Sequence, residues 1–248
     1  LRATVAAAPG TLPAEVVVVV NHLRSLNDIS DRADGPRVRA KRLAQAQYVA
    51  RLLGDLRAQY PGVPVVSVGA YNAFKENDGY VDVLGIVRGA PAPATEVVAF
   101  GGDLLAPDFL LAPVVANTPA DQTYSYSFDG NAQSLDHVLV SVEAAQVLTA
   151  FDHARVNADF PEVLRGDAAR IERTSDHDPA IAYFRFPTDT TPPVITVPAP
   201  QTVTAQGPLG AVVTYTATAV DDLEGPVPAV CPPASGTLFP NRAPTVSC

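Results

Sequence analysis

Two short apolar runs in the first third of the chain each end in a cluster of side chains that could carry chemistry. Residues 63–68 read as a buried strand, and the tetrapeptide GAYN at 69–72 follows directly. A valine run at 16–20 leads in the same way into NHLRS at 21–25. Open α/β sheets usually keep their reactive groups at the carboxyl ends of strands, and histidine is the commonest acid or base there. Taken alone, such an Asn-His pair is more often structural than catalytic.

The segment between these clusters has the period of an amphipathic helix. One stripe of residues 37–60 is apolar, and Pro61-Gly62 ends the pattern. Strand, helix and strand in this order favour a crossover unit, which brings both polar clusters to one rim if the strands are parallel. Eight of the seventeen Lys and Arg residues lie between Arg24 and Arg57. For most of them we expect a solvated helix face.

A hairpin is predicted further along the chain. Residues 124–128 alternate as a strand does, Asp129-Gly130 is typical of a turn, and residues 134–140 are expected to form the second strand. Asp136 opens that strand. His137 is expected to point to the opposite face and to be structural, because successive side chains of a strand alternate.

A second histidine cluster, SDHDP at 175–179, precedes the last strand of this part, at 181–184. An isolated Asp-His-Asp is only weakly specific for catalysis. Asp152-His153 is another such pair, and we interpret it as surface structure. Residues 81–120 are rich in glycine and proline and are interpreted as mostly loop.

The order NHLRS, GAYN, SLDH and SDHDP, over about 160 residues, resembles the endonuclease/exonuclease/phosphatase superfamily of metal-dependent phosphodiesterases, which includes pancreatic-type deoxyribonuclease. The runs at 77–82 and 157–161 are similar to segments of its ExeM-like branch of extracellular nucleases. The resemblance implies an α/β fold, a four-layer α/β/β/α sandwich. Residues 1–186 would form its carboxyl-terminal part, without the amino-terminal asparagine and glutamate that hold the metal in the family.

The resemblance also implies roles for single residues. His22 would contact the scissile phosphate or protonate the leaving oxygen, with Arg24 beside it in the place of the usual lysine. Asn72 would hold a phosphate oxygen or the attacking water. Asp136 would orient His177, which would stabilise the pentavalent phosphate.

The metal and the catalytic base are the points at which the chain departs from the family. Asp176 is expected to bind or adjoin a divalent cation, Mg²⁺ by preference and otherwise Mn²⁺ or Ca²⁺. The family motif reads Gly-Asp-aromatic-Asn, but this chain has Ala70 in the place of the aspartate that aligns or deprotonates the attacking water. A methyl group can do neither.

Composition limits the classes of partner. The chain has 248 residues, 47% of them hydrophobic, which suffices for one large domain with a small appendage. A net charge of −9 argues against a protein that coats polyanions by charge alone, so a nucleic acid substrate would require a cation. No apolar run reaches the length of about 20 residues that a membrane helix needs.

Residues 187–193 read as a linker, and residues 194–248 resemble a hyalin repeat, a truncated immunoglobulin-like β-sandwich module of extracellular proteins. Cys231 and Cys248 lie in this segment. A disulfide worth roughly 3 kcal/mol is the preferred interpretation, with two buried free thiols as the alternative. The hyalin-like pattern would place the two cysteines on facing strands.

Together these features predict a secreted or cell-surface phosphodiesterase, by preference a nuclease acting on DNA or RNA through in-line attack of water. One alternative is a phosphatase, or a phosphodiesterase for phospholipids or phosphosugars, on the same fold. The other is a binding protein that has lost its chemistry at Ala70 and uses its appended module to contact extracellular ligands.

Overall fold

The computed structural model describes residues 2–5, 14–101, 109–186, 191–222, 225–242 and 244–248. These fall into two compact units, one formed by residues up to 186 and the other by residues from 191 onward. The prediction of a mixed α/β fold accompanied by a β-only module is confirmed. Within the described part of the chain, no helix combines the length and the apolar character needed to cross a bilayer.

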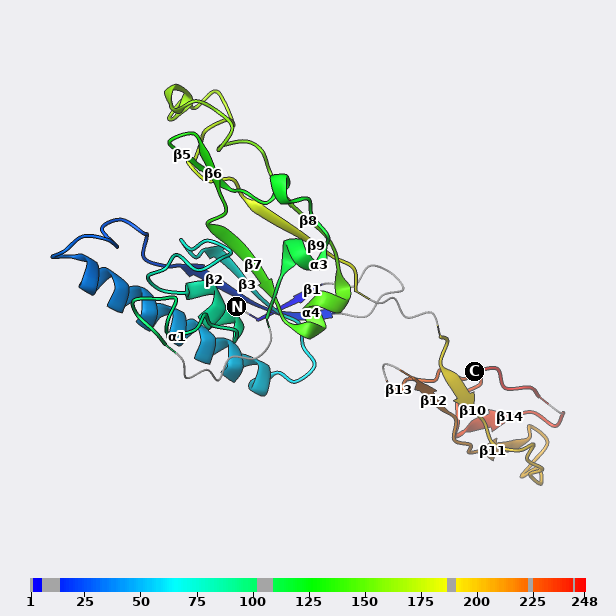
Figure 1. Cartoon of the computed structure of the whole chain (residues 1–248). Coiled ribbons are helices and arrows are strands. Elements are labelled where there is room, and N and C mark those ends of the chain that lie inside the picture. Colours follow the sequence, from blue (N-terminus) through cyan, green and yellow to red (C-terminus); the bar gives the residue numbers. More distant parts are fainter. Residues whose placement is uncertain (1, 6–13, 102–108, 187–190, 223–224, 243) are drawn as a thin grey trace. The chain divides into compact units, whose positions relative to one another are not determined.

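A five-stranded sheet organises the first unit (Figure 1). Its strands, in spatial order, are β1 (Arg2–Val5), β2 (Ala14–His22), β3 (Val65–Ala70), β7 (Asp136–Val140) and β4 (Leu110–Leu111). β2 and β3 are parallel, and the other neighbours are antiparallel. The two strands that carry the first polar clusters therefore end at the same edge of the sheet.

Helix α1 (Gly35–Gln59) connects β2 to β3. It begins with a proline in its first turn, where the missing N–H costs nothing, and it ends just before Pro61-Gly62. A second helix, α2 (Val83–Arg88), lies in the segment that the sequence favoured as loop. Its cap is local: the Asp82 carboxylate accepts the N–H of Gly85 at 2.9 Å, and Gly89 closes the helix in the left-handed conformation.

Both faces of the sheet are covered, because alternate residues of its strands enter different cores. Val65 and Leu139 pack against α1 and α2 on one face. Val66 and Val138 pack on the other face, against the segments that follow β4 and β7. Those segments comprise α3 (Ala112–Val115), the 3-10 turn at Ala120–Gln122, α4 (Val142–Val147), β8 (Leu148–His153), the 3-10 turn at Glu162–Leu164 and β9 (Ala180–Phe184).

The predicted hairpin is present, but its second strand is different. β5 (Tyr126–Phe128) pairs with β6 (Asn131–Gln133) across Asp129-Gly130, and both turn residues have positive φ, 47° and 77°. The chain then leaves the hairpin, and β7 joins the central sheet beside β3. The prediction that Asp136 opens the second hairpin strand was therefore wrong. It opens a central strand, because residues 134–135 break the pairing.

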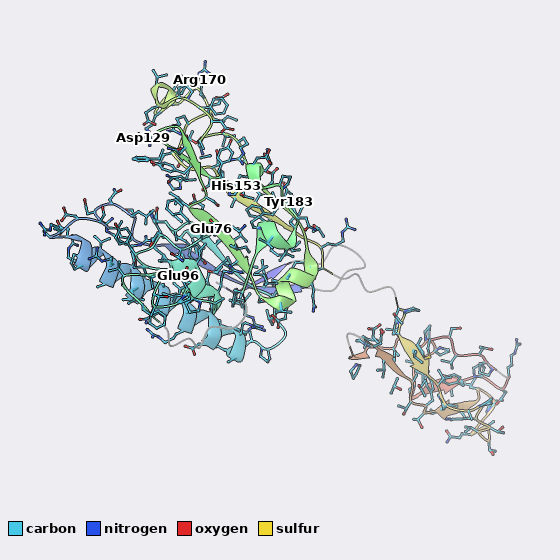
Figure 2. All side chains as sticks on the ribbon, viewed as in Figure 1. Glu76, Glu96, Asp129, His153, Arg170 and Tyr183 are labelled. Atoms are coloured by element: carbon cyan, nitrogen blue, oxygen red, sulfur yellow. A yellow bond between two sulfur atoms is a disulfide. The ribbon has the colours of Figure 1, made fainter. Side chains whose placement is uncertain are left out.

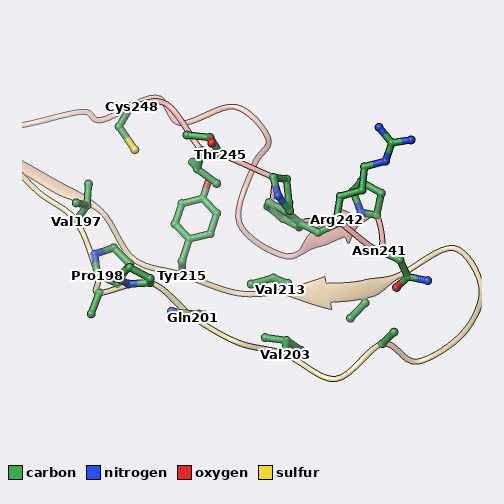
Figure 3. Close-up of a pocket in the computed structure, with 18 residues that line it drawn as sticks. Val197, Pro198, Gln201, Val203, Val213, Tyr215, Asn241, Arg242, Thr245 and Cys248 are labelled. Carbon is green, nitrogen blue, oxygen red and sulfur yellow. The ribbon is translucent and has the colours of Figure 1, made fainter.

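The second unit consists of short strands: β10 (Val194–Thr196), β12 (Thr218–Asp221) and β13 (Gly225–Val227) form one ladder, and β11 (Ala211–Val213) and β14 (Thr237–Phe239) form another. Cys231 and Cys248 are joined by a disulfide, with a Cα–Cα distance of 4.1 Å, so the disulfide prediction is confirmed. Neither cysteine lies in a strand, so their predicted placement on facing strands was wrong. Tyr215 and Arg242 are among the residues that line a pocket beside the β11–β14 ladder (Figure 3).

Candidate active site

Three strand ends align His22, Ala70 and Asp136 in one row. Ala70 is registered with His22 of β2 on one side and with Asp136 of β7 on the other. Registered neighbours project from the same face of a sheet, so these three side chains share the face on which Val66 and Val138 also lie. Position 70 thus places a methyl group between a histidine and a carboxylate.

Gly69 fixes this row. Its φ is +126°, and a Cβ at this position would lie 2.1 Å from the backbone oxygen of Asn21 in the adjacent strand. Only glycine allows β2 and β3 to approach so closely where the two polar clusters begin. The glycine of the GAYN tetrapeptide is therefore required by the backbone.

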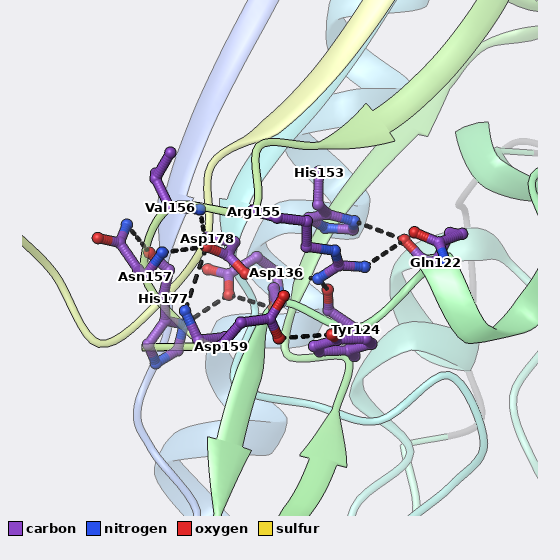
Figure 4. A network of polar contacts seen from close by, with 12 residues as sticks. Gln122, Tyr124, Asp136, His153, Arg155, Val156, Asn157, Asp159, His177 and Asp178 are labelled. Atoms are coloured by element: carbon purple, nitrogen blue, oxygen red, sulfur yellow. Dashed lines mark hydrogen bonds and ion pairs between the residues drawn. The ribbon is translucent and has the colours of Figure 1, made fainter. Parts of the chain in front are cut away.

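His177 completes the row from a different part of the chain. It precedes β9, and its Nδ1 donates to Oδ2 of Asp136 at 2.5 Å (Figure 4). This hydrogen bond raises the pKa of His177, although partial burial of the ring opposes the effect. Burial by itself would raise the pKa of the Asp136 carboxyl, but hydrogen bonds from His177 and Ser125 outweigh burial and lower it. The pair therefore favours an imidazolium beside a carboxylate, with Nε2 left for another partner.

Ser125 holds the carboxylate of this pair and was not identified from the sequence. Its hydroxyl donates to Oδ2 of Asp136 at 2.6 Å and accepts the backbone N–H groups of Leu135 and Asp136. The side chain is completely buried. The alternation of residues 124–128 placed Ser125 on one face of a strand, but the sequence alone did not show that this face meets Asp136.

Asp178 and Asn157 shape the loop that presents His177 (Figure 4). Oδ1 of the buried Asp178 accepts the backbone N–H groups of residues 156–158, at 2.7–3.2 Å. Asn157 donates from Nδ2 to the backbone oxygen of His177 at 2.6 Å. The sequence predicts no catalytic group at 157–161, and in the structure Asn157 of this segment holds the histidine backbone.

Arg42 ties together the two loops that follow β2 and β3. Its Nη1 donates to the backbone oxygens of Arg24, at 2.5 Å, and of Asn72, at 2.8 Å. Its Nη2 is 3.3 Å from the carboxylate of Asp78. Arg42 is 1% exposed, so the expectation of a solvated helix face was wrong for this residue. Its burial follows from the need to satisfy carbonyl groups between the helix and the strand ends.

The remaining predicted site residues differ in the exposure of their side chains and in the hydrogen bonds that these side chains already make. His22 is exposed, and no hydrogen bond or ion pair of its ring occurs within the described part of the chain. Asn72 is 9% exposed, and its Nδ2 already donates to the Leu23 backbone oxygen at 2.9 Å. The Arg24 guanidinium donates to Ser25 and to the Asn27 backbone oxygen in the loop after β2.

The other two histidines are buried. His137 donates from Nε2 to the backbone oxygen of Ala73 at 2.7 Å, on the face opposite Asp136, and burial lowers its pKa. His153 of β8 is 3% exposed (Figure 2), so its interpretation as surface structure was wrong. It packs edge-on against Phe151, and burial lowers its pKa as well.

The described residues do not provide a divalent-metal site. Asp176 is half-buried, and its carboxylate accepts only a 3.4 Å bond from the Ser175 hydroxyl. No group of three or more His, Cys, Asp or Glu side chains able to hold a metal occurs among the described residues. The carboxylate of Asp78 faces Arg42, and Ala70 supplies no ligand.

No protein-family model matches the chain, and no curated protein is similar to it. Among solved structures, truncated TDP2 of Caenorhabditis elegans is similar at 18% identity and a TM-score of 0.42, over 69% of this chain and 56% of that one. The 3′-5′ exonuclease NExo of Neisseria meningitidis is similar at 17% identity and a TM-score of 0.38, over 70% and 62%. The chain thus spans less than two thirds of the length of either structure.

Proposed function

We propose that the first unit is a phosphodiesterase of the endonuclease/exonuclease/phosphatase type, and that its substrate is nucleic acid. The observation that carries this proposal is the His177–Asp136 hydrogen bond of 2.5 Å, placed in the same row as His22 at the carboxyl ends of β2 and β3. A histidine whose tautomer and orientation are fixed by a carboxylate can donate from its other nitrogen to a phosphate or to a leaving oxygen.

The residues would act in the following way. His177, held by Asp136 and favoured in its charged form, donates from Nε2 to a non-bridging oxygen and stabilises the charge that develops on the pentavalent phosphate. His22, exposed at the end of β2 in the same row, donates to a second oxygen or gives its proton to the leaving oxygen. Arg24 and Asn72 shape the loops on the other side of the row. Asp176 would contribute a carboxylate next to His177.

Position 70 offers the attacking water no base. A family-type aspartate at position 70 would lie between His22 and Asp136, but the methyl group of Ala70 accepts no proton. Divalent cations such as Mg²⁺ supply charge stabilisation in related chemistry, yet the described residues do not fit such an ion. We therefore expect binding of a phosphodiester with slow hydrolysis.

Ala70 specifically favours a second candidate function, that of a phosphoester-binding protein without turnover. A plasmid-nicking assay beside a phosphomonoester assay separates the possibilities. Nicking that is lost in His177→Ala supports the phosphodiesterase. Release of phosphate from a monoester alone points instead to a phosphatase. Retention of labelled DNA without cleavage of either substrate supports the binding protein.

The disulfide of the second unit bears on the location of the protein. A disulfide between Cys231 and Cys248 persists in oxidising surroundings, which supports an extracellular or cell-surface location. We assign the unit a hyalin-like role, that of contacting extracellular or cell-surface ligands. Detection of the oxidised protein in the medium of its native cells tests the location, and retention only in the reduced cell interior would contradict it.

A further inference from the structure

Three rings form a row that begins at the candidate catalytic histidine. The ring of Tyr126 lies over that of His177, with centroids 4.6 Å apart and planes tilted by 33°. The ring of Phe128 stacks beside Tyr126, with centroids 6.4 Å apart and an interplanar angle of 20°. Tyr126 and Phe128 are two positions apart on β5, so both project from the same face of the hairpin. We call these two side chains the aromatic strip.

The aromatic strip is fixed relative to His177. β5 is held by its ladder with β6 and by the tight turn at Asp129-Gly130. At its base, Ser125 donates to Asp136 through its side chain, and its backbone oxygen accepts the N–H of Asp178 at 2.7 Å. The same residues that hold the His177–Asp136 pair therefore also hold the strip. A group bound on the strip would be registered against the reacting phosphate.

The outer ring of the strip is open. Phe128 is 54% exposed, although it is one of the most apolar side chains of the unit. Asp129 adjoins Phe128, so the affinity that we assign to this end of the strip is apolar and does not depend on charge. Planar rings that are open on one face bind other planar groups by stacking, and nucleobases supply such a face whatever their identity.

We propose that the aromatic strip binds the base of the nucleotide adjoining the scissile phosphodiester, and that it selects unpaired nucleotides. This inference rests on the proposed function and names its substrate class: single-stranded DNA or RNA, including frayed ends, with little sequence preference. A paired base cannot offer its face to the strip, because that face is occupied by its neighbours in the duplex. Because the strip is continuous with His177, we identify its occupant as the base next to the reacting phosphate.

The test compares the binding of labelled oligonucleotides to the full chain by fluorescence anisotropy. The probes are a single strand, the corresponding duplex and an abasic strand with the same number of phosphates. Phe128→Ala should weaken binding of the single strand about tenfold, with little change for the duplex or the abasic strand. Phe128→Tyr keeps a stacking ring and should retain affinity. Phe100→Ala is the matched control, because Phe100 is 48% exposed and adjoins Gly101, which packs against α1 on the other face of the sheet.

The outcomes separate this inference from the proposed function. An unchanged affinity of Phe128→Ala for the single strand overturns the inference, provided that its urea unfolding midpoint matches that of the parent chain. Equal affinity of the parent chain for base-carrying and abasic strands also overturns it, while phosphodiester recognition stands. If the parent chain binds none of the three probes, both the inference and the proposed function are wrong. Loss of affinity for the single strand in Phe128→Ala, together with its retention in Phe128→Tyr, supports the inference.

Discussion

The hydrogen bond between His177 and Asp136 leads to a prediction that combines stability and titration. Asp136→Asn keeps the size of the side chain but removes the charge that the imidazolium faces at 2.5 Å. A hydrogen bond to a charged group contributes about 1.5–3 kcal/mol, and both side chains are largely shielded, with exposures of 24% and 14%. We therefore expect Asp136→Asn to lower the free energy of unfolding by about 2 kcal/mol at pH 6, and to lower the pKa of His177.

The dependence of this loss on pH follows from the two pKa shifts. The pKa of His177 is raised in the folded state, so its contribution is fully present below its unfolded value of about 6.5 and is lost as pH rises through the folded value. The pKa of Asp136 is lowered, so its contribution is present above about 3.9 and is lost as pH falls through the folded value. The difference between parent and variant should be largest between these limits and should shrink at alkaline pH.

The assay is urea unfolding across this pH range, together with an NMR titration of the His177 ring protons. Ser125→Ala serves as a control variant, because it removes one hydrogen bond from the Asp136 carboxylate and leaves its charge. We expect it to leave the raised pKa of His177 in place, because the carboxylate that raises this pKa keeps its charge. An unchanged His177 titration in Asp136→Asn, or a loss of stability that is the same at every pH, would refute the coupling.

Three further predictions concern the stability of the two units. Arg42→Met should cost about 3–5 kcal/mol of stability in urea unfolding, because it leaves a buried carboxylate without its partner, and a cost below 1 kcal/mol would contradict the tie that we describe. Gly69→Ala should destabilise the chain by about 3 kcal/mol or more, because its Cβ would clash with the backbone of the adjacent strand. Gly130→Ala is the control and should cost about 1 kcal/mol, because Gly130 also has a positive φ but open space around it. Equal costs would argue against the close approach of the strands. Reducing the Cys231–Cys248 disulfide should lower the stability of the second unit by about 3 kcal/mol, and thiol labelling of the unreduced protein would contradict the bond.

Elements with a clear period could be predicted from the sequence. The predicted helix agrees with α1 to within two residues at either end. The strand predicted at 63–68 is covered on both faces, as its valines at both odd and even positions indicate. The short helix α2 was missed. Six residues among glycines and prolines give too little periodic signal, and its cap depends on the local conformation of Asp82.

The candidate site could be predicted only in part, for a related reason. Polar clusters at strand ends mark where reactive groups gather, and the register indeed places His22 beside position 70. The groups that hold them come from remote segments. Arg42 meets Asp78 across 36 positions of sequence, and Ser125 meets Asp136 only because the chain leaves the hairpin before β7. Such partners are determined by tertiary packing, which a local pattern does not report.

The proposed phosphodiesterase function is tested most directly at position 70, by single-turnover cleavage of an end-labelled oligonucleotide in the presence and in the absence of Mg²⁺. The comparison includes the parent chain, Ala70→Asp, Ala70→Asn as a control of similar size without a basic carboxylate, and Ala70→Asp combined with His177→Ala. A general base is worth about 10²–10⁴-fold in rate. We predict a gain of this order in Ala70→Asp alone, and its loss when His177→Ala is added. If Ala70→Asp folds and binds the oligonucleotide but cleaves no faster than Ala70→Asn, the row at the ends of β2, β3 and β7 is not a phosphodiesterase site.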